Sequence, residues 1–456
     1  MGRRSVSRAL DIWSNGQKLG QWRLPARGPM ELQYHPAWIA SPEARPLSLS
    51  LPFNLDNLPL KGERIGLYFD NLLPDSEAIR RRLQSRFHTR AQDAFDLLEA
   101  IGRDCVGAVQ LLPEGQSPEN VFSIEAETLD DEALERLLRA AVSSPLPGTA
   151  MATDDFRISL AGAQEKTALL WHEGRWCRPR GATPTTHIFK FPLGLVGHRE
   201  ADMHTSVENE WLCTRILTAY GLAVAPCAIR RFGEQKVLVV ERFDRKLHSS
   251  GAWWLRLPQE DFCQATGTPV SLKYESDGGP GLLPIARILQ GSQNRDEDLA
   301  TLLRAQLLFW MMAATDGHAK NFSVSLLSGG RYRLTPLYDV LSAWPLVGSG
   351  PGKLDRRELK LAMALRGKNS HYRLADIQRR HFNTTARLCG LGTDMETIIT
   401  DVLARTPAVI EQVAAQLPED FPGEVFSAVA AGLMDSSRRL ESMATVRLVP
   451  KATTSP

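Results

Sequence analysis

The 456-residue sequence lacks long apolar runs and a strong charge of either sign. Its longest apolar stretch, Leu307–Ala314, is far shorter than the roughly 18 residues that a membrane-spanning helix needs, so we expect no membrane partner. A formal net charge of +2 excludes a globally basic nucleic-acid binder, and any basic patch must be local. Arg3 and Arg4 are not followed by an apolar core, so we also expect no signal peptide.

Cysteines at metal-binding or redox spacing are missing too. None of the six stands in a C-x-x-C pair: Cys105, Cys177, Cys213, Cys227, Cys263 and Cys389. Scattered single cysteines in a chain of this length indicate reduced thiols rather than a disulfide framework or a zinc site. Hydrophobic residues make up 43% and charged residues 23%, which is typical of an ordinary folded protein. We therefore expect a folded cytoplasmic protein, without repeats or low-complexity blocks.

The length alone predicts about three domains, or one two-lobed body with an extra module. Residues 1–110 form the first expected domain, with a helix over 76–90 that Ser76 caps and that carries arginines on its exposed face. An acidic helix over 129–141 precedes Ser143–Gly148, a Ser/Pro/Gly string that we interpret as a linker. We expect a second domain over 111–245, a third over 246–445 and a disordered tail over 446–456.

The most informative segment runs from Leu299 to Asp339. Its first half has apolar residues on every side, which predicts a buried helix that ends in the polar loop Thr315–Asn321. Two alternating segments then flank the turn signal Ser328–Gly330 and predict a β-hairpin. Because Asn321 and Asp339 each lie nine residues from residue 330, the hairpin places their side chains close together at its open end.

An amide oxygen and a carboxylate that converge in this way form a hard oxygen site, which suits Mg2+. Asp316 is then available to accept a proton from a hydroxyl group. A loop Asp as base, with an Asn and a second Asp on the metal, is the division of labour in kinase-like phosphoryl transfer. Taken alone, each Asp could be a turn or cap residue. His318 has no second His or Cys at ligand spacing, which favours a hydrogen-bonding loop histidine over a base or metal ligand.

A kinase also needs a lysine on a strand of its other lobe. Lys190 lies in the apolar strand pattern Thr186–Phe191, where an ammonium group is costly unless it has an anionic partner such as the phosphates of ATP. An edge strand that lets the lysine reach solvent is the alternative. Glu208 or Glu210 could pair with Lys190, in a helix opened by the expected capping box Thr205-x-x-Glu208. The residues do not favour one glutamate over the other.

Two more segments fit nucleotide binding. The strand from Lys236 runs into Glu241–Phe243, where a kinase hinge would offer backbone groups to adenine, although an ordinary strand end has the same pattern. Ala161–Lys166 combines small residues with a lysine, so its backbone N–H groups could approach phosphate. It matches neither G-x-G-x-x-G nor G-x-x-x-x-G-K-[ST], so the pattern alone is weak.

These motifs together resemble the HipA family of toxin serine/threonine kinases. The resemblance spans most of the chain, from about residue 1 to residue 440. The matching stretches occur in this order: Phe69–Asp75, Ile101–Asp104, Val106–Val109, Ala161–Thr167, Thr185–Lys190, Val240–Arg245, Leu257–Asp261, Lys273–Gly281, Ala314–Ser323 and Leu334–Asp339.

The resemblance implies an α+β, two-lobed protein-kinase-like fold of the atypical, phosphoinositide-kinase-like branch. It adds an N-terminal β-rich subdomain and an all-helical C-terminal lobe. Asp316 matches the catalytic base, and Asn321 and Asp339 match the Mg2+ ligands. ATP-binding positions would be the phosphate loop Ala161, Gly162, Ala163, Gln164, Glu165 and Lys166, then Lys190, the hinge Glu241, Arg242 and Phe243, and the neighbours His318, Asn321 and Tyr338. Ser159 matches the family's autophosphorylated serine, whose modification switches the kinase off. A phosphate there would place about −2 charge beside the ATP phosphates.

The resemblance also implies partners. The substrate would be an aminoacyl-tRNA synthetase, glutamyl-tRNA synthetase first, whose phosphorylation stalls translation and causes dormancy. The antitoxin would be a small helix-turn-helix dimer that represses its operon on operator DNA. Arg379 and Arg380, with His381, match the DNA-contacting segment. Lys353–Arg387 carries ten Lys and Arg against three Asp and Glu, which suits phosphate contacts, although a solvated helix face would look similar.

One departure from kinases is that Asp339 is followed by Val340 and Leu341, without a Phe-Gly switch. Two other functions stay open at this point. A small-molecule or lipid kinase on the same scaffold would need the same Asp/Asn/Asp set. A catalytically idle co-repressor would use the basic C-terminal segment on DNA.

Overall fold

A computed structural model describes residues 7–142, 159–197 and 200–444. The predicted linker Ser143–Gly148 and the predicted tail 446–456 lie outside the described residues. Contacts divide the chain into two units. The first comprises Met1–Phe191, Ala225–Leu272 and Ser323–Tyr332, and the second comprises Pro192–Val224, Lys273–Phe322 and Arg333–Pro456. The domain boundaries at 110 and 245 stay a prediction.

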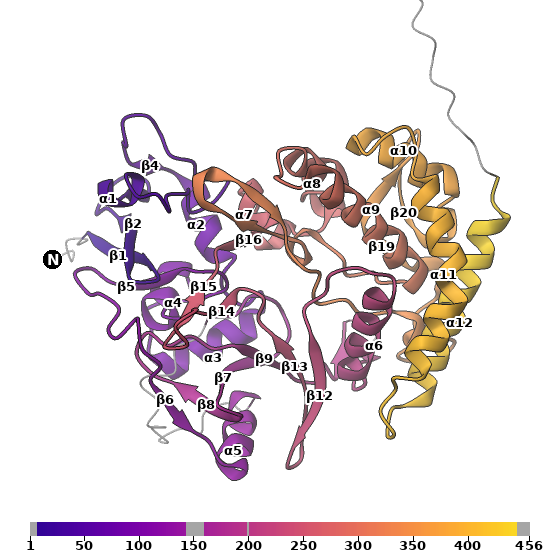
Figure 1. Cartoon of the computed structure of the whole chain (residues 1–456), viewed down its shortest axis with the longest axis horizontal. Coiled ribbons are helices and arrows are strands. Elements are labelled where there is room, and N and C mark those ends of the chain that lie inside the picture. The colour runs from indigo at the N-terminus through magenta and orange to yellow at the C-terminus, as the bar shows by residue number, and fades with distance from the viewer. Residues whose placement is uncertain (1–6, 143–158, 198–199, 445–456) are drawn as a thin grey trace, which may run out of the picture. The chain divides into compact units, whose positions relative to one another are not determined.

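The first unit opens with a five-stranded antiparallel sheet in the order β4-β3-β2-β1-β5 (Figure 1). Its strands are β1 Arg8–Ser14, β2 Gln17–Leu24, β3 Glu31–Tyr34, β4 Leu60–Lys61 and β5 Gln110–Pro113. The helices of this part are α1 Pro36–Ile39, α2 Glu63–Asp70, α3 Glu77–Phe87 and α4 Ala94–Ile101. In the core, Trp22 stacks on Phe69 with ring centroids 4.1 Å apart. Ser76 caps α3 by accepting the Ile79 N–H, which confirms the predicted helix start.

A six-stranded antiparallel sheet in the order β12-β13-β9-β7-β8-β6 follows in the same unit. Its strands are β6 Ala126–Thr128, β7 Lys166–His172, β8 Arg175–Pro179, β9 His187–Lys190, β12 Cys227–Phe232 and β13 Gln235–Glu241. The amphipathic helix α5, Asp131–Val142, buries Leu134 and Leu138 in a core that includes Leu169 and Phe189. This helix confirms the acidic helix predicted over 129–141.

The first unit ends in short strands and the predicted hairpin. The remaining elements are β14 Arg245–Leu247, β15 Trp254–Arg256, β16 Gln259–Asp261, α7 Phe262–Thr266, η1 Val270–Leu272 and β17 Ser323–Leu326, with β18 Tyr332–Leu334 next to β17. The turn η4, Ser328–Gly330, has φ values of 73° and 74° at its two glycines, a left-handed region that glycine adopts at little cost. The Leu327 N–H donates to the Arg331 carbonyl at 2.7 Å, which closes the turn. The hairpin prediction is thus confirmed.

The second unit is mainly helical and is built around one buried helix. Its helices are α6 Ser206–Ala219, α8 Leu282–Leu289, α9 Arg295–Met312, α10 Arg379–Cys389, α11 Glu396–Ala414 and α12 Gly423–Ser442. Helix α9 packs against α6, α8, α10, α11 and α12, and residues such as Leu307 and Trp310 are fully covered, as the apolar pattern predicted. No helix of the described residues is both long enough and apolar enough to cross a membrane.

Two details differ from expectation. Strands β10 Leu195–Val196, β11 Ala201–Asp202, β19 Lys360–Arg366 and β20 Ser370–Arg373 belong to the second unit, and further strands lie between residues 246 and 334, so the C-terminal part is not all-helical. The short 3-10 helices of the second unit are η2 Glu275–Asp277, η3 Ala319–Asn321, η5 Trp344–Leu346, η6 Arg356–Glu358 and η7 Leu374–Asp376. Thr205 precedes α6 but its side chain makes no cap hydrogen bond, so the predicted capping box is wrong.

Candidate active site

The polar loop after α9 is held by close backbone packing. Helix α9 ends at Met312, and the next residue, Ala313, has a left-handed φ of 50° that turns the chain away from the helix. At Gly317 an added Cβ would lie 2.5 Å from the Phe309 ring, so only glycine lets the loop pass this closely over α9. The His318 N–H donates to the Asp316 carbonyl at 2.8 Å, and the Asn321 N–H donates to the His318 carbonyl at 2.9 Å. The loop is therefore tightly wound and anchored on a buried helix.

Asn321 joins the two ends of the predicted hairpin. Its Nδ2 donates to the Asp316 carbonyl at 2.8 Å and to the Asp339 carbonyl at 3.3 Å. Carbonyl oxygens only accept, so these bonds fix which end of the amide is nitrogen. Within the described residues the Oδ1 of Asn321 accepts no hydrogen bond, and that oxygen remains for another ligand. The Asn321 side chain thus reaches the Asp339 backbone, and the expected approach of the two side chains stays a prediction.

Asp339 occupies a strained position in this site. Its φ of 61° lies in the left-handed region, which is uncommon for residues other than glycine and which Asp tolerates better than most. The following segment is clamped by Asn209 of α6, which accepts from the Ser342 N–H and donates to the Ser342 carbonyl, both at 2.8 Å. The Ser342 hydroxyl also donates to the Met312 carbonyl at 2.5 Å. These bonds hold the backbone that carries Asp339.

Asp316 is the accessible carboxylate of the loop, since 57% of its side chain is exposed. The Tyr274 hydroxyl donates to its Oδ1, and the Nε2 of the buried His318 lies 3.9 Å from the same oxygen. The Tyr274 and His318 rings meet edge to face with centroids 5.0 Å apart. Tyr338 donates its hydroxyl to the carbonyl of the buried Lys320 at 2.8 Å. Asp316, His318, Asn321, Tyr338 and Asp339 are therefore brought together in the second unit.

The donor set at Asn321 and Asp339 fits a hard divalent cation. An amide oxygen and a carboxylate supply two ligands, and Mg2+ usually keeps several waters and binds one or two carboxylates together with substrate phosphates. Across residues 7–142, 159–197 and 200–444, no group of three or more His, Cys, Asp or Glu side chains could hold a metal ion by itself.

The predicted phosphate loop lies in the first unit. Residues from the N-terminal part of that unit hold it in place. The Gly162 carbonyl accepts from the Asp75 N–H at 3.0 Å, and Glu165 pairs with Arg82 of α3. Gly162 has a left-handed φ of 105°, and a Cβ there would lie 2.6 Å from the Lys166 Nζ. Lys166 donates to the Ala161 carbonyl. Arg82 is thus a contact of this loop rather than part of a solvated helix face.

Ser159 and Gln164 anchor the two sides of the same loop. Ser159 is fully buried, and its hydroxyl donates to the Leu72 carbonyl at 2.8 Å while its N–H donates to the Asp104 carbonyl at 3.1 Å. The Gln164 Nε2 donates to the Phe191 carbonyl at 2.5 Å, and the Phe191 N–H donates to the Glu165 carbonyl at 3.2 Å. These bonds hold the loop beside the residue that follows β9.

Lys190 lies at the end of β9, beside Lys166 of β7 in the ladder, and is only 6% exposed. A lysine buried in a sheet between strands needs an anionic partner, as the sequence indicated. Glu208 and Glu210 are both buried in α6 of the second unit, and their pairing with Lys190 stays a prediction.

The predicted hinge residues have different surroundings. Glu241 is exposed, whereas Arg242 is buried with its guanidinium bonded to Asp244 at 2.8 Å. The N–H groups of Glu241 and Arg242 donate to the carbonyls of Pro226 and Thr186 at 2.8 and 2.9 Å. The Arg242 side chain thus serves the interior of the first unit, which does not fit a side-chain contact with nucleotide.

The predicted DNA-contacting residues differ in their exposure. Arg379 is buried at the start of α10 and donates from its Nε to both carboxylate oxygens of Glu396, at 3.0 and 3.1 Å. This pairing engages the Arg379 guanidinium within the protein, and its contact with DNA stays a prediction. Arg380 is exposed on the same helix, and His381 is buried.

Sequence reasoning gave no role to several residues that shape these sites. Tyr274 contacts the Asp316 carboxylate, and the carboxylate of Glu275 accepts from the Ala364 N–H at 2.7 Å and pairs with Arg366. At Gly281 an added Cβ would lie 2.2 Å from the Glu275 carboxylate, which explains that glycine. Tyr274, Glu275 and Gly281 all stand in the stretch Lys273–Gly281, so the motif itself was the available signal.

Comparisons with known proteins agree with this architecture. The HipA N-terminal domain model matches residues 10–112, and the HipA-like C-terminal domain model matches residues 158–410. A solved complex of the Shewanella oneidensis MR-1 toxin–antitoxin system, HipA and HipB with operator DNA, contains a chain with a TM-score of 0.76 at 23% identity, over 95% of this chain and 98% of that one. The fold is thus the two-lobed, kinase-like α+β fold of that chain.

Sequence relatives carry the assignment further. The chain is 32% identical to the putative kinase Y4mE of Sinorhizobium fredii, over 89% of this chain and 92% of the relative. It is 30% identical to the serine/threonine-protein kinase toxin HipA of Shewanella oneidensis, over 82% of each protein. The chain belongs to the HipA family.

Proposed function

We propose that the chain is an ATP-dependent serine/threonine protein kinase and the toxin of a toxin–antitoxin pair. Its target would be an aminoacyl-tRNA synthetase, with glutamyl-tRNA synthetase first, whose phosphorylation inhibits translation. The observation that carries the kinase assignment is the Asn321 amide, which binds the backbone of both Asp316 and Asp339. One side chain thus ties the proposed base to the proposed metal ligand, in a chain whose relatives are named as kinases.

The roles follow from the chemistry of each side chain. The exposed Asp316 carboxylate would accept the proton of the substrate hydroxyl. The Asn321 amide oxygen and the Asp339 carboxylate would hold Mg2+, which, with ATP, supplies charge neutralisation at the transferred phosphoryl group. His318 and Tyr338 would lie beside the nucleotide, because both contact the loop that carries these ligands.

In the first unit, Lys190 and the loop Ala161–Lys166 would bind the phosphates. Glu241 and Phe243 would serve the adenine through their backbone. Ser159 would be the site of inactivating autophosphorylation. Its hydroxyl is fully buried and bonded to Leu72, and a doubly charged phosphate has no place in such surroundings. Modification of Ser159 would therefore require the loop to leave its present position and would leave the phosphate site incomplete.

The partners that we propose are a small helix-turn-helix antitoxin dimer and, through it, operator DNA. The HipA of Shewanella oneidensis was solved with HipB and operator DNA, and the fold of this chain is the same. The exposed Arg380 would contact the phosphate backbone directly.

Labelled ATP with cell extract tests the proposal. We expect wild-type protein to mark a protein of synthetase size, and Asp316→Asn to reduce transfer by about 10²–10⁴-fold because the base is lost. Asp420→Asn, an exposed aspartate on the loop after α11, is the matched control and should transfer normally.

The outcomes separate the other functions as well. Equal labelling by wild type and Asp316→Asn would overturn the kinase assignment. Label in a small molecule or lipid instead of a protein would favour a metabolite or lipid kinase. Operator binding that is unchanged in Asp316→Asn, without any transfer by wild type, would favour a co-repressor.

A further inference from the structure

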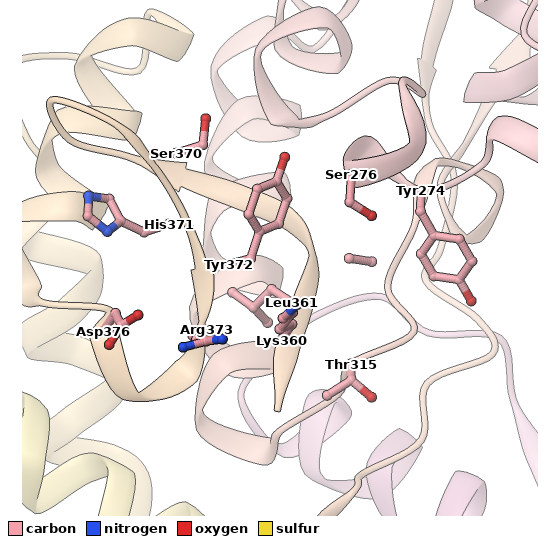
Figure 2. A pocket seen from close by; sticks show the side chains of 11 residues that line it. Tyr274, Ser276, Thr315, Lys360, Leu361, Ser370, His371, Tyr372, Arg373 and Asp376 are labelled. Carbon is pink, nitrogen blue, oxygen red and sulfur yellow. The ribbon is translucent and has the colours of Figure 1, made fainter. Parts of the chain in front are cut away.

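A cavity of about 410 Å³ adjoins the catalytic loop within the second unit. The loop at η2 forms one wall through Tyr274 and Ser276, and the β19–β20 hairpin forms another (Figure 2). Thr315, directly before the proposed base, also lines it. The motif Lys273–Gly281, to which the proposed catalytic machinery gives no role, thus provides one side of a pocket that reaches Thr315, the residue before Asp316.

The two walls are fixed to each other. Glu275 accepts the Ala364 N–H of β19 at 2.7 Å and pairs with Arg366 of the same strand. Burial is the main cause that raises the pKa of Glu275, against the opposing effects of the Ala364 N–H and of Arg366. The register of β19 with β20 shifts between Lys360 and Leu365, and such irregularities commonly redirect side chains beside active sites. The two walls of the cavity are therefore linked through Glu275.

The cavity concentrates positive charge. Lys360 and Arg373 are direct partners across the β19–β20 ladder, so their side chains lie on the same face, and both line the cavity. Like charges directly opposite each other are destabilising in an antiparallel pair. Within the described residues, neither side chain has an ion pair or a side-chain hydrogen bond. The carboxylate of Asp376 and the ring of His371 line the same space without pairing to either. An anion placed there would offset the repulsion.

We propose that this cavity binds an anionic side chain of the polypeptide substrate close to the phosphoacceptor residue, either a carboxylate or a phosphate ester. The proposal rests on the kinase function proposed above. A substrate serine or threonine has to reach the Asp316 carboxylate, so the neighbouring residues of the substrate meet the wall that Tyr274 and Thr315 share with the cavity. The Tyr372 hydroxyl lies there for the substrate backbone, and the Ser276 hydroxyl, which donates to Asp277 at 3.1 Å, can still accept from it.

Tyr274 couples the cavity to the base. Its hydroxyl donates to the Asp316 carboxylate, which is the contact that a substrate hydroxyl makes with a kinase base. The substrate hydroxyl would therefore share the Asp316 carboxylate with Tyr274. An anion bound beside Lys360 would place the substrate next to this carboxylate, so the cavity would contribute to selectivity and not only to affinity.

Binding of peptides to the full-length Asp316→Asn protein, without ATP, tests the cavity separately from catalysis. Each fluorescent peptide has one serine in an Ala/Gly background, with Glu, phosphoserine, Gln or Lys at one flanking position. We expect anisotropy to show about tenfold tighter binding of an acidic peptide than of its Gln counterpart. The Lys360→Glu and Arg373→Glu changes should abolish that preference and favour the Lys peptide.

Lys368→Glu is the matched control, because Lys368 is an exposed lysine of the same hairpin that does not line the cavity. It should keep the acidic preference. Equal binding of Glu, phosphoserine and Gln peptides would overturn the proposal, as would an equal loss in Lys368→Glu. Preference for phosphoserine alone would identify the anion as a phosphate ester. Acidic selectivity without phosphate transfer by wild type would retain the binding site and reject the kinase.

Discussion

Two groups of cationic side chains in this protein differ in burial and in their acidic partners. In the first unit, Arg242, Arg245 and Arg256 are buried around Asp104 and Asp244. Arg245 lies 2.9 Å and Arg256 3.2 Å from Asp104, and Arg242 lies 2.8 Å from Asp244. In the second unit, Lys360 and Arg373 are exposed, face each other across a strand pair and have no acidic partner within the described residues.

The electrostatics of the buried group explain two family motifs. Burial alone would raise the pKa of Asp104, but the charges of Arg245, Arg256 and Arg242 outweigh it and hold that pKa far below its usual range. Burial would also raise the pKa of Asp244, but the charges of Arg242 and Arg245 outweigh it and lower that pKa to about 2. The stretches Ile101–Asp104 and Val240–Arg245 supply most of this network. Paired, buried charges therefore mark structure here, whereas unpaired charges that line a cavity mark recognition.

Replacement of Asp104, one of the two buried acids, should have the largest effect on stability. Asp104→Asn leaves three buried guanidinium groups with one carboxylate, and we expect the free energy of unfolding to fall by about 3–5 kcal/mol. Urea titration followed by circular dichroism measures this change.

The matched control for that change is Asp70→Asn. It removes the ion pair between Asp70 and Arg80 of α3. The Asp70 carboxylate is 31% exposed, so the free energy of unfolding should fall by less than about 1 kcal/mol. Similar losses in Asp104→Asn and Asp70→Asn would show that the buried network contributes no more than a surface pair.

A third buried carboxylate in the first unit sharpens the comparison, because it has no arginine beside it. Glu260 is fully buried and accepts the Leu49 N–H at 2.8 Å. Burial raises its pKa from 4.5 to about 8, against the smaller opposing effects of Leu49 and Ser48. The folded protein therefore binds a proton at Glu260 that the unfolded chain has already released at neutral pH.

The sign of the pH effect follows from that difference. The stabilisation is complete below about pH 4.5, decreases as the pH rises and is lost above about pH 8. Glu260→Gln keeps the shape without titrating. We expect the stability of wild type relative to this variant to fall by a few kcal/mol between about pH 5 and pH 8. Thermal unfolding of both proteins across this range measures it, and a constant difference would contradict the raised pKa.

Local patterns predicted the hairpin. Nine residues on either side of residue 330 were enough to bring Asn321 to Asp339, because strand register is a local property of the chain. The helix α9 was equally readable, since a helix buried on all sides is apolar on all sides.

Contacts between residues far apart in the sequence could not be predicted. No local pattern places Tyr274 on Asp316, 42 residues away, or Asp104 on Arg245, 141 residues away. The pairing of Arg379 with Glu396 could not be predicted for a related reason, because Glu396 belongs to another helix. Composition gives the net charge of a segment, whereas only tertiary structure decides which of its charged side chains are paired.

The smallest expected effect concerns the exposed pair itself. Lys360→Glu replaces two like charges across β19 and β20 by an opposite-charge pair with Arg373, so the protein should become more stable by a few tenths of a kcal/mol to about 1 kcal/mol. Lys368→Glu, on the same hairpin, should give no such gain. The difference should shrink in about 1 M salt, because exposed charges are screened. A variant that is stabilised yet loses its acidic peptide would show that Lys360 is kept for a ligand and not for the fold.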